Sequence, residues 1–228
     1  MGNFFKKLFR PSKKDQFNCF SSESYSQEGE DMILKPFFND IEIRKGFYVD
    51  VGALHPFRFS NTACFYKLGW SGINIEPTPS AIDLFTEYRK RDINLNLGVA
   101  EESTEMTFYC FDEPALNSFS KDLSEQRAST TNYKIIDKKK IQVKPLRVIL
   151  DEFIPKGQKI DFLNIDVEGL DLQVLRSNDW EKYRPDFVLC EDILDFESLP
   201  ASQVYKFLME REYLLVAKTL RTLIFKTK

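Results

Sequence analysis

The stretch G-F-Y-V-D-V-G-A-L-H-P, residues 46–56, decides the fold. Its first part, F-Y-V-D-V, is an apolar run of strand length without a helical period, and a glycine follows it directly. The acid Asp50 and the glycine Gly52 place polar groups at the carboxyl end of a buried strand. The only histidine of the chain, His55, lies three residues beyond that glycine.

Strand-like and helix-like segments alternate outward from this stretch. Short apolar runs predict strands at residues 71–77, 93–100, 105–111, 160–169 and 185–192. Amphipathic segments predict helices at 26–38, before Gly69, at 79–90, at 170–177 and at 201–211. The polar residues 112–140 show no clear period and predict a long loop or lid, and residues 213–227 predict a hairpin. This alternation predicts an α/β fold with a mostly parallel sheet, helices on both faces and a C-terminal antiparallel hairpin.

The bulk composition is that of one folded domain. The chain has 228 residues, of which 43% are hydrophobic and 29% charged, and its net charge is -3. We therefore expect a single domain over residues 21–228 and no nucleic-acid partner, because no global positive field attracts one. The four cysteines form no CxxC pair, and no run of about 18 apolar residues occurs. Buried reduced thiols and a cytoplasmic location are the expectation.

Residues 1–20 form a basic amphipathic arm in the sequence. Apolar Phe4, Phe5, Leu8 and Phe9 recur at helical spacing among lysines and an arginine. This composition is typical of a short helix that lies on an anionic membrane surface, so the arm predicts a peripheral contact with the inner face of the membrane. A terminus that packs on the domain, or frays, is the alternative.

Ligands of such sheets bind beyond the carboxyl ends of the strands. The predicted strand ends supply the candidate cofactor contacts, which are Asp50, Gly52, Ala53, Glu76, Pro77 and Asn96. An acid at the second strand end can accept both hydroxyls of a ribose, but the G-x-G-x-x-G cradle for a diphosphate is missing. S-adenosylmethionine, which carries a ribose, an ammonium and a sulfonium but no phosphate, fits this pattern.

Several longer motifs carry a family resemblance in the same chain order. They are S-Q-E-G-E-D, F-Y-V-D-V-G-A-L-H-P-F-R-F-S-N-T, G-W-S-G-I-N-I-E-P, R-D-I-N-L-N-L-G-V-A and F-L-N-I-D-V-E-G. From about residue 25 to about residue 195 the chain resembles the FkbM-type S-adenosylmethionine-dependent O-methyltransferases. The resemblance implies a class I methyltransferase sheet, methyl transfer to a hydroxyl that is often on a sugar, and cofactor contacts from Asp50, Gly52 and Glu76.

A sugar hydroxyl is a poor nucleophile, so a base or a metal ion should help. His55, Asp166 and Glu168 are the candidate catalytic residues, and Asn61 is a candidate contact for the acceptor. In a second solution, Asp166 with Glu191 or Asp192 holds Mg²⁺, which lowers the pKa of the hydroxyl. The histidine could instead only shape its turn, and the acids could cap the helices that follow.

Two other functions compete with the methyltransferase. A nucleotide-sugar glycosyltransferase would use D-V-E as a metal motif, although no diphosphate cradle is present. A non-catalytic, membrane-associated adaptor would use the same fold without turnover. The acceptor predicted for the enzyme is a glycan or another small molecule that carries a hydroxyl, and lipid-linked glycans would suit the basic arm.

Overall fold

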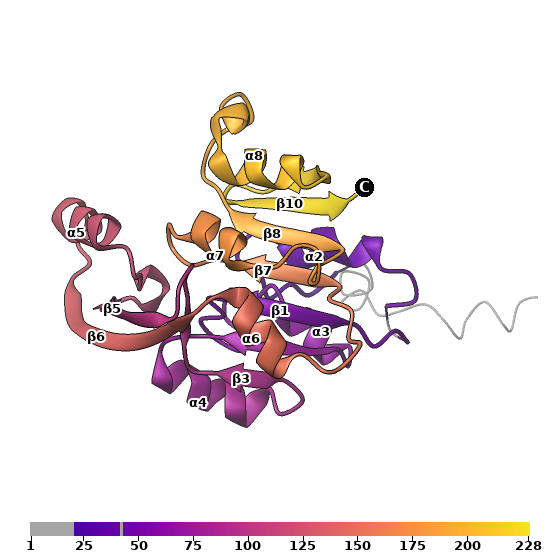
Figure 1. Cartoon of the computed structure of the whole chain (residues 1–228), viewed down its shortest axis with the longest axis horizontal. Coiled ribbons are helices and arrows are strands. Elements are labelled where there is room, and N and C mark those ends of the chain that lie inside the picture. Colours follow the sequence, from indigo (N-terminus) through magenta and orange to yellow (C-terminus); the bar gives the residue numbers. More distant parts are fainter. Residues whose placement is uncertain (1–20, 42) are drawn as a thin grey trace, which may run out of the picture.

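A computed structural model describes residues 21–41 and 43–228, and the arm predicted for residues 1–20 lies outside the described residues. A seven-stranded sheet with the order β3-β2-β1-β7-β8-β10-β9 forms the centre of the molecule (Figure 1). Its strands are β1 (Phe47–Val51), β2 (Ser71–Ile75), β3 (Ile93–Leu95), β7 (Phe162–Ile165), β8 (Phe187–Glu191), β9 (Tyr213–Lys218) and β10 (Thr222–Thr227).

In this sheet, the five neighbouring strands β3, β2, β1, β7 and β8 pair in parallel. The strand β10 pairs antiparallel with both β8 and β9. The predicted C-terminal hairpin is therefore confirmed, with one addition. Its second strand enters the sheet beside β8, while its first strand, β9, becomes the edge. The chain order reverses between β1 and β7, because the strands after β1 extend to one side and the later strands to the other. The topological switch point lies there.

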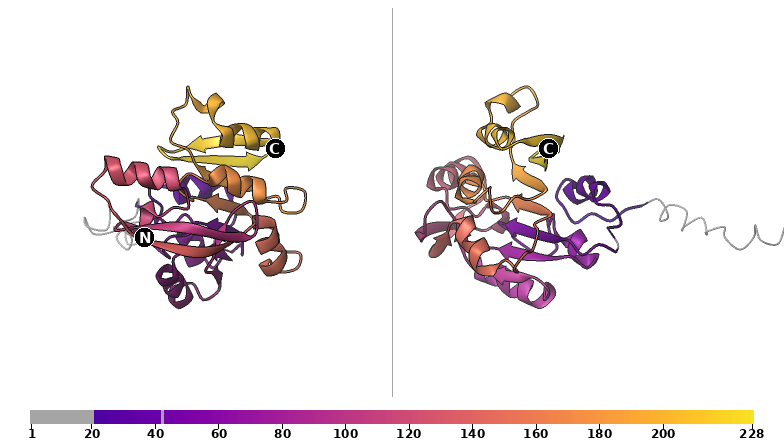
Figure 2. Two further views of the ribbon diagram at one scale, coloured as in Figure 1. Left: turned by 60° about the vertical axis from the view of Figure 1, so that its left-hand side comes forward. Right: turned by 45° about the vertical axis from the view of Figure 1, so that its right-hand side comes forward.

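Helices cover both faces of the sheet, as the right-hand view of Figure 2 shows. The first face carries α6 (Leu146–Phe153), α7 (Asp171–Ser177) and α8 (Gln203–Glu210), whose apolar residues share one core with β1, β2, β7 and β8. The second face carries α2 (Glu30–Leu34), the 3-10 turn η2 (Lys35–Phe37) and α3 (Ala63–Lys67) around the buried Trp70. The helix α4 (Pro79–Tyr88) lies against β3.

The segment predicted as a long loop, residues 112–140, is mostly regular structure, so that prediction is wrong in part. It holds η3 (Pro114–Leu116), α5 (Lys121–Thr130) and the first half of β6 (Ile135–Lys144). The strand β6 pairs with β5 (Thr104–Phe111) and, at its end, with β4 (Gly98–Val99), in a second sheet. Ser120 accepts the backbone N–H of Leu123 and caps α5, whose surface is almost entirely polar. Because α5 has no apolar stripe, its sequence shows no helical period of hydrophobic residues, and the helix was not predicted.

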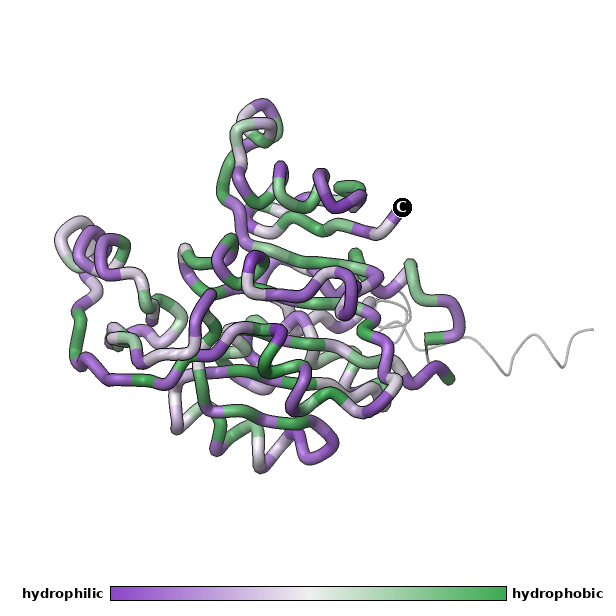
Figure 3. Tube along the Cα trace, in the orientation of Figure 1, coloured by the Kyte–Doolittle hydropathy of each residue, from purple (hydrophilic) through white to green (hydrophobic). Residues whose placement is uncertain are grey.

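Two further boundaries differ from the sequence predictions. Residues 93–100 form two short strands, β3 and β4, that belong to different sheets. The strand β5 begins at Thr104, one residue before the predicted start, and it is exposed at its start and buried at its end because it runs from solvent into the interior. Figure 3 shows hydrophobic residues concentrated in the central strands and hydrophilic ones along β6. Among the described residues, no helix is long and apolar enough to cross a membrane.

Candidate active site

A cleft of about 930 Å³, including its open mouth, lies at the carboxyl ends of β1, β2 and β7. This is the switch point, where ligands of open α/β sheets bind. The loop after β1 forms one wall. The other wall is formed by Phe108 of β5 and by Asn117, Ser118 and Phe119 of the segment between β5 and α5. Figure 1 shows β5, β6 and α5 together at this end of the sheet. We call residues 104–144 the lid.

Gly52 lies where β1 leaves the sheet, with a φ of 80° that favours glycine. A Cβ atom at this position would overlap the backbone carbonyl oxygen of Asp166, the residue that follows β7. Asp166 in turn donates its backbone N–H to the carbonyl of Val51 (3.0 Å). The glycine therefore allows the ends of β1 and β7 to approach each other, in addition to lining the cleft.

Asp50 is 1% exposed and lies on the floor of the cleft. Its two carboxylate oxygens accept hydrogen bonds from Thr62 Oγ1 (2.9 Å) and from Asn164 Nδ2 (2.8 Å). Burial raises the pKa of Asp50, and the two hydrogen bonds and the nearby Arg89 oppose that rise. Asp50 is therefore a held, preorganised group and not one with a free face toward solvent.

Glu76 follows β2 and is 5% exposed. One oxygen accepts the backbone N–H of Leu54 (3.0 Å) and the other that of Thr78 (2.7 Å), so the carboxylate joins the loops after β1 and β2. Burial raises its pKa, and these hydrogen bonds act against the rise. Each oxygen keeps a second lone pair that can accept a ligand hydroxyl. Ala53 and Pro77 also line the cleft.

Asn96, the third predicted cofactor contact from a strand end, does not line the cleft. Its Nδ2 donates to the backbone carbonyls of Glu76 and Pro77, both at 3.0 Å. The side-chain amide therefore fixes the loop after β2 instead of meeting a ligand. The next two residues along the chain, Leu97 and Gly98, reach the cleft in its place.

His55 lies outside the cleft, in a shallow groove beside it. Its Nδ1 accepts the backbone N–H groups of Phe57 and Arg58, each at 3.0 Å. Burial, followed by the positive charge of Arg58, lowers the pKa of the imidazole and favours its neutral form. The geometry supports the alternative from the sequence, a histidine that shapes its turn, and does not place it as a base.

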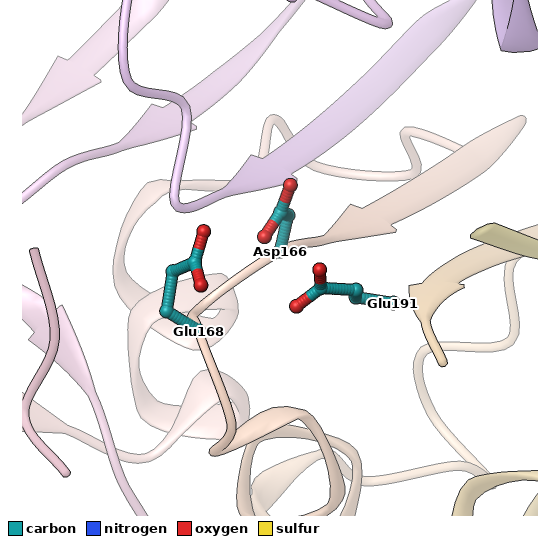
Figure 4. Close-up of side chains that lie close together, drawn as sticks. All are labelled: Asp166, Glu168 and Glu191. Atoms are coloured by element: carbon teal, nitrogen blue, oxygen red, sulfur yellow. The ribbon is translucent and has the colours of Figure 1, made fainter. Parts of the chain in front are cut away.

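Three carboxylates form a cluster at the ends of β7 and β8. Side-chain oxygens of Asp166, Glu168 and Glu191 lie within 4.8 Å of one another, and Figure 4 shows the three side chains pointing toward a common space. Asp166 and Glu168 line the cleft. The sequence predicted Asp166 and Glu191 for a metal site, and the structure adds Glu168, whose φ of 55° turns its side chain out of the strand direction.

Asp192, the other predicted metal ligand, is not part of this cluster. Its carboxylate accepts hydrogen bonds from Ser202 Oγ and from the backbone N–H of Leu194. Ser202 caps α8, so Asp192 fixes the loop that leads into that helix. Neighbouring residues of an extended strand point to opposite sides, which explains why Glu191 reaches the cluster and Asp192 does not.

Two members of the cluster, Asp166 and Glu191, have raised pKa values. The side chain of Asp166 is exposed to the open cleft, and the loss of hydration among the surrounding protein atoms, followed by the charges of Glu191 and Glu168, raises its pKa. Burial and the charge of Glu168 raise the pKa of Glu191 to about 7. Asp171, buried at the start of α7, has a pKa of about 8 because of burial and the charge of Glu191. Like charges at this spacing favour a bound proton or cation.

The lid contributes contacts that the sequence did not predict. Arg127 of α5 forms an ion pair with Glu168 and donates to the carbonyl of Leu116. Ser118 Oγ donates to the backbone carbonyl of Glu168 (2.8 Å). The lid is therefore fastened to the residue that links β7 to α7.

The cleft also contains polar residues that we did not predict from the sequence. Gln27 reaches it from the S-Q-E-G-E-D motif, and Asn164 reaches it from within β7. Asn61, a predicted acceptor contact, lines the cleft and donates to Asn164 Oδ1 (2.9 Å). A polar residue inside an otherwise apolar strand was the available signal for Asn164, since buried polar groups need partners.

The strand order and the cleft define a Rossmann-like α/β protein with the sheet of a class I methyltransferase. The methyltransferase FkbM domain matches residues 50–215, and the chain belongs to that family. No curated protein matches the chain. One solved structure, "Crystal structure of a putative O-methyltransferase from Klebsiella pneumoniae", is 10% identical, with 98% of this chain and 94% of that chain covered and a TM-score of 0.43. Similarity at this level carries no argument about function.

Proposed function

We propose that the protein is an S-adenosylmethionine-dependent O-methyltransferase that acts on a hydroxyl group of a sugar. The observation that carries this proposal is the cleft at the switch point, where Asp50, Gly52 and Glu76 converge in a chain of the FkbM methyltransferase family. Family membership favours methyl transfer over the glycosyltransferase alternative.

The residues of the cleft fit the cofactor. The carboxylate of Glu76 is fixed by two backbone N–H groups and keeps lone pairs for the ribose hydroxyls. Leu97, Gly98 and Phe108 supply apolar surface for a purine ring. One buried acceptor atom, Asn61 Oδ1, has no partner among the described residues and suits a ligand with a donor.

Titration of S-adenosylmethionine into the purified protein tests this proposal directly. We expect micromolar binding to the wild-type protein and binding at least ten times weaker to Glu76→Ala, since both ribose contacts are lost. No binding to the wild-type protein, with or without Mg²⁺, would contradict the proposal. Sugar nucleotides would then be titrated next, to test the glycosyltransferase alternative.

The bound cofactor supplies a methyl group that its sulfonium has already activated. The chain has to align the acceptor oxygen with that methyl group and remove the hydroxyl proton. Asp166 is the best-placed base, because it faces the cleft at the switch point and its raised pKa makes its carboxylate a stronger proton acceptor. With the cofactor held at Glu76, Asp166 would accept the proton that the acceptor hydroxyl loses.

A divalent cation is the alternative to Asp166 as a free base: Asp166 would then be a ligand, and the cation would lower the pKa of the acceptor hydroxyl. Three carboxylates within 4.8 Å offer the oxygen ligands that Mg²⁺ prefers, and the raised pKa values of Asp166 and Glu191 indicate uncompensated negative charge. Glu191→Gln should therefore abolish any rise in melting temperature that Mg²⁺ gives to the wild-type protein. Asp192→Asn, one residue away but outside the cluster, is the matched control and should keep that rise. A wild-type melting temperature that Mg²⁺ leaves unchanged would exclude the cation site.

The acceptor and its setting follow from the sequence. We propose a glycan or glycolipid acceptor and a cytoplasmic enzyme whose basic arm, residues 1–20, contacts the inner face of the membrane. Removal of residues 2–14 should lower co-sedimentation with anionic vesicles. Equal co-sedimentation of the full and shortened chains would rule out the membrane role of the arm.

A further inference from the structure

A chain of side-chain hydrogen bonds crosses the floor of the cleft. Thr62 Oγ1 and Asn164 Nδ2 donate to the two oxygens of Asp50, at 2.9 and 2.8 Å. Asn61 Nδ2 donates to Asn164 Oδ1 at 2.9 Å. Asn61 Oδ1 is buried and has no partner among the described residues, and Asn61 lines the cleft. The chain therefore ends in one acceptor that lacks a donor.

The donor and the acceptor of each hydrogen bond in this series are fixed by its two charged members, Arg89 and Asp50. Arg89 is fully buried and can only donate, and one of its nitrogens donates to Thr62 Oγ1 (3.2 Å), so the threonine hydroxyl donates onward to Asp50. The carboxylate of Asp50 accepts, which requires Asn164 to present its NH₂ group to Asp50 and its oxygen to Asn61. Asn61 must then donate to Asn164. Its own oxygen is left as the free acceptor.

A buried acceptor without a partner is destabilising, so a ligand that brings a donor removes that penalty. The preferred donor is a cation. The negative charge of Asp50 lies two hydrogen bonds away, and hydrogen bonds in a chain polarise one another, which makes the terminal oxygen more negative. No guanidinium or ammonium of the described residues contacts Asn61 Oδ1.

On the basis of the proposed function, we propose that Asn61 Oδ1 receives the α-ammonium group of S-adenosylmethionine, and that Asn164 is the positioning residue that aims it. This assigns Asn61 to the cofactor instead of the acceptor. It also makes the contact of Asp50 with the ammonium indirect, because both oxygens of that nearly fully buried carboxylate are held by protein donors.

The test compares two ligands by calorimetry, S-adenosylhomocysteine and its analogue without the α-amino group. The wild-type protein should bind the analogue at least ten times more weakly than S-adenosylhomocysteine. Asn61→Leu should bind S-adenosylhomocysteine about ten times more weakly than the wild-type protein, and the analogue with unchanged affinity. A general loss of structure would weaken both ligands and is thereby distinguished.

Asn178→Leu is the matched control. Asn178 is buried and donates through Nδ2 to the backbone carbonyl of Tyr183; like Asn61, it has a buried Oδ1 without a partner, but it lies outside the cleft. Its substitution should leave both affinities within twofold of the wild-type values. If it weakened S-adenosylhomocysteine as much as Asn61→Leu does, the selective role of Asn61 would be refuted.

The role of Asn164 is tested by a double-mutant cycle. If Asn164 acts through Asn61, Asn164→Leu should weaken S-adenosylhomocysteine selectively, and the double variant should bind it no more weakly than the weaker single variant. Additive losses would refute the positioning role.

Three results separate the two proposals. Failure of the wild-type protein to bind S-adenosylhomocysteine would remove the proposed function, and this inference with it. Binding of S-adenosylhomocysteine and its deaminated analogue by the wild-type protein with equal affinity would overturn only the ammonium contact, without any need for a variant. Unchanged binding of S-adenosylhomocysteine by a folded Asn61→Leu would overturn the assignment to Asn61.

Discussion

The acids at the carboxyl edge of the sheet fall into two groups with opposite surroundings. At β1 and β2, every carboxylate oxygen of Asp50 and Glu76 accepts a hydrogen bond from a fixed donor. At β7 and β8, the oxygens of Asp166, Glu168 and Glu191 lie within 4.8 Å of one another, and Arg127 is the one cation paired with them among the described residues. We call these the paired acids and the crowded acids.

Under the proposed function, this difference assigns cofactor binding to the paired acids and proton transfer to the crowded acids. The paired acids are preorganised, so a ligand that meets them loses little entropy in ordering the site. Among the crowded acids, the loss of hydration and the neighbouring negative charges raise the pKa values of Asp166 and Glu191.

The largest effect should come from the glycine at the junction of the two groups. Gly52→Ala places a Cβ on the carbonyl oxygen of Asp166 at a φ of 80°, so we expect a loss of roughly 4 kcal/mol in the free energy of unfolding, or no folded protein. Gly157→Ala is the matched control, because its φ is 77° and nothing lies within 4 Å of the added Cβ. Its cost should be about 1 kcal/mol. Urea unfolding of both variants measures the difference, and equal losses would show that the approach of β1 to β7 is not tight.

The raised pKa values of Glu191, one of the crowded acids, and of its neighbour Asp171 should make the stability of the protein depend on pH. A carboxyl whose pKa is higher in the folded than in the unfolded protein binds more protons when folded, so its stabilisation is full at low pH and is lost as the pH rises. For Asp171 and Glu191 the loss runs from about pH 4 to their folded values of about 8 and about 7. In metal-free buffer, the melting temperature should therefore fall between pH 5 and pH 8.

Asp171→Asn isolates that effect, because it removes a buried charge but keeps the shape of the side chain. We expect the variant to melt on the order of 5 °C higher than the wild-type protein at pH 8, and to show a smaller difference at pH 5. Asp151→Asn is a control, since the pKa of that exposed carboxyl is lowered by its hydrogen bonds from Lys182 and Tyr183. A wild-type melting temperature that rises from pH 5 to pH 8 would contradict the raised pKa values of Asp171 and Glu191.

The paired acids were accessible to sequence reasoning, and so were most of the crowded ones. Asp50, Glu76 and Asp166 each follow or end an apolar run, and parallel strand ends meet at one edge of a sheet. The same reasoning also selected Asn96, which does not line the cleft, and Asp192, which lies outside the carboxylate cluster. A strand end gives the edge at which a residue lies, but the direction of its side chain depends on the pleat and on the loop that follows.

The contacts made by the lid could not be found in this way. Arg127 lies on α5, which has no apolar stripe, and meets Glu168 across 41 positions of sequence. Asn164 lies inside β7, where spacing says nothing about its partners in β1 and the following loop. Long-range polar pairs of this kind depend on the packing of the whole fold, which no local period encodes.

A smaller effect should follow from the cation among the crowded acids. The charge of Arg127 lowers the pKa of Glu191, so Arg127→Gln should raise that pKa above about 7 and shift the pH dependence of stability upward. Because both partners of the Arg127–Glu168 pair are partly exposed, the loss in stability at pH 7 should be only about 0.5–1 kcal/mol. Lys121→Gln, which breaks the exposed pair with Glu125, is the control and should change nothing measurable. If Arg127→Gln and the wild-type protein showed the same pH dependence of stability, the charge of Arg127 would not offset the negative charge of the cluster.

The smallest effect should come from the only histidine, which belongs to neither group of acids. Its Nδ1 accepts two backbone N–H groups, and an asparagine at the same position can accept them through its side-chain oxygen, as in an Asx turn. His55→Asn should therefore bind S-adenosylhomocysteine within twofold of the wild-type affinity and melt within about 2 °C of the wild-type protein. In contrast, His55→Leu loses the acceptor and should loosen the loop whose Leu54 N–H donates to Glu76. A methyl-transfer rate that drops a hundredfold in His55→Asn, with the affinity intact, would instead identify the imidazole as the base and move the proton-accepting role from the crowded acids to the rim of the paired ones.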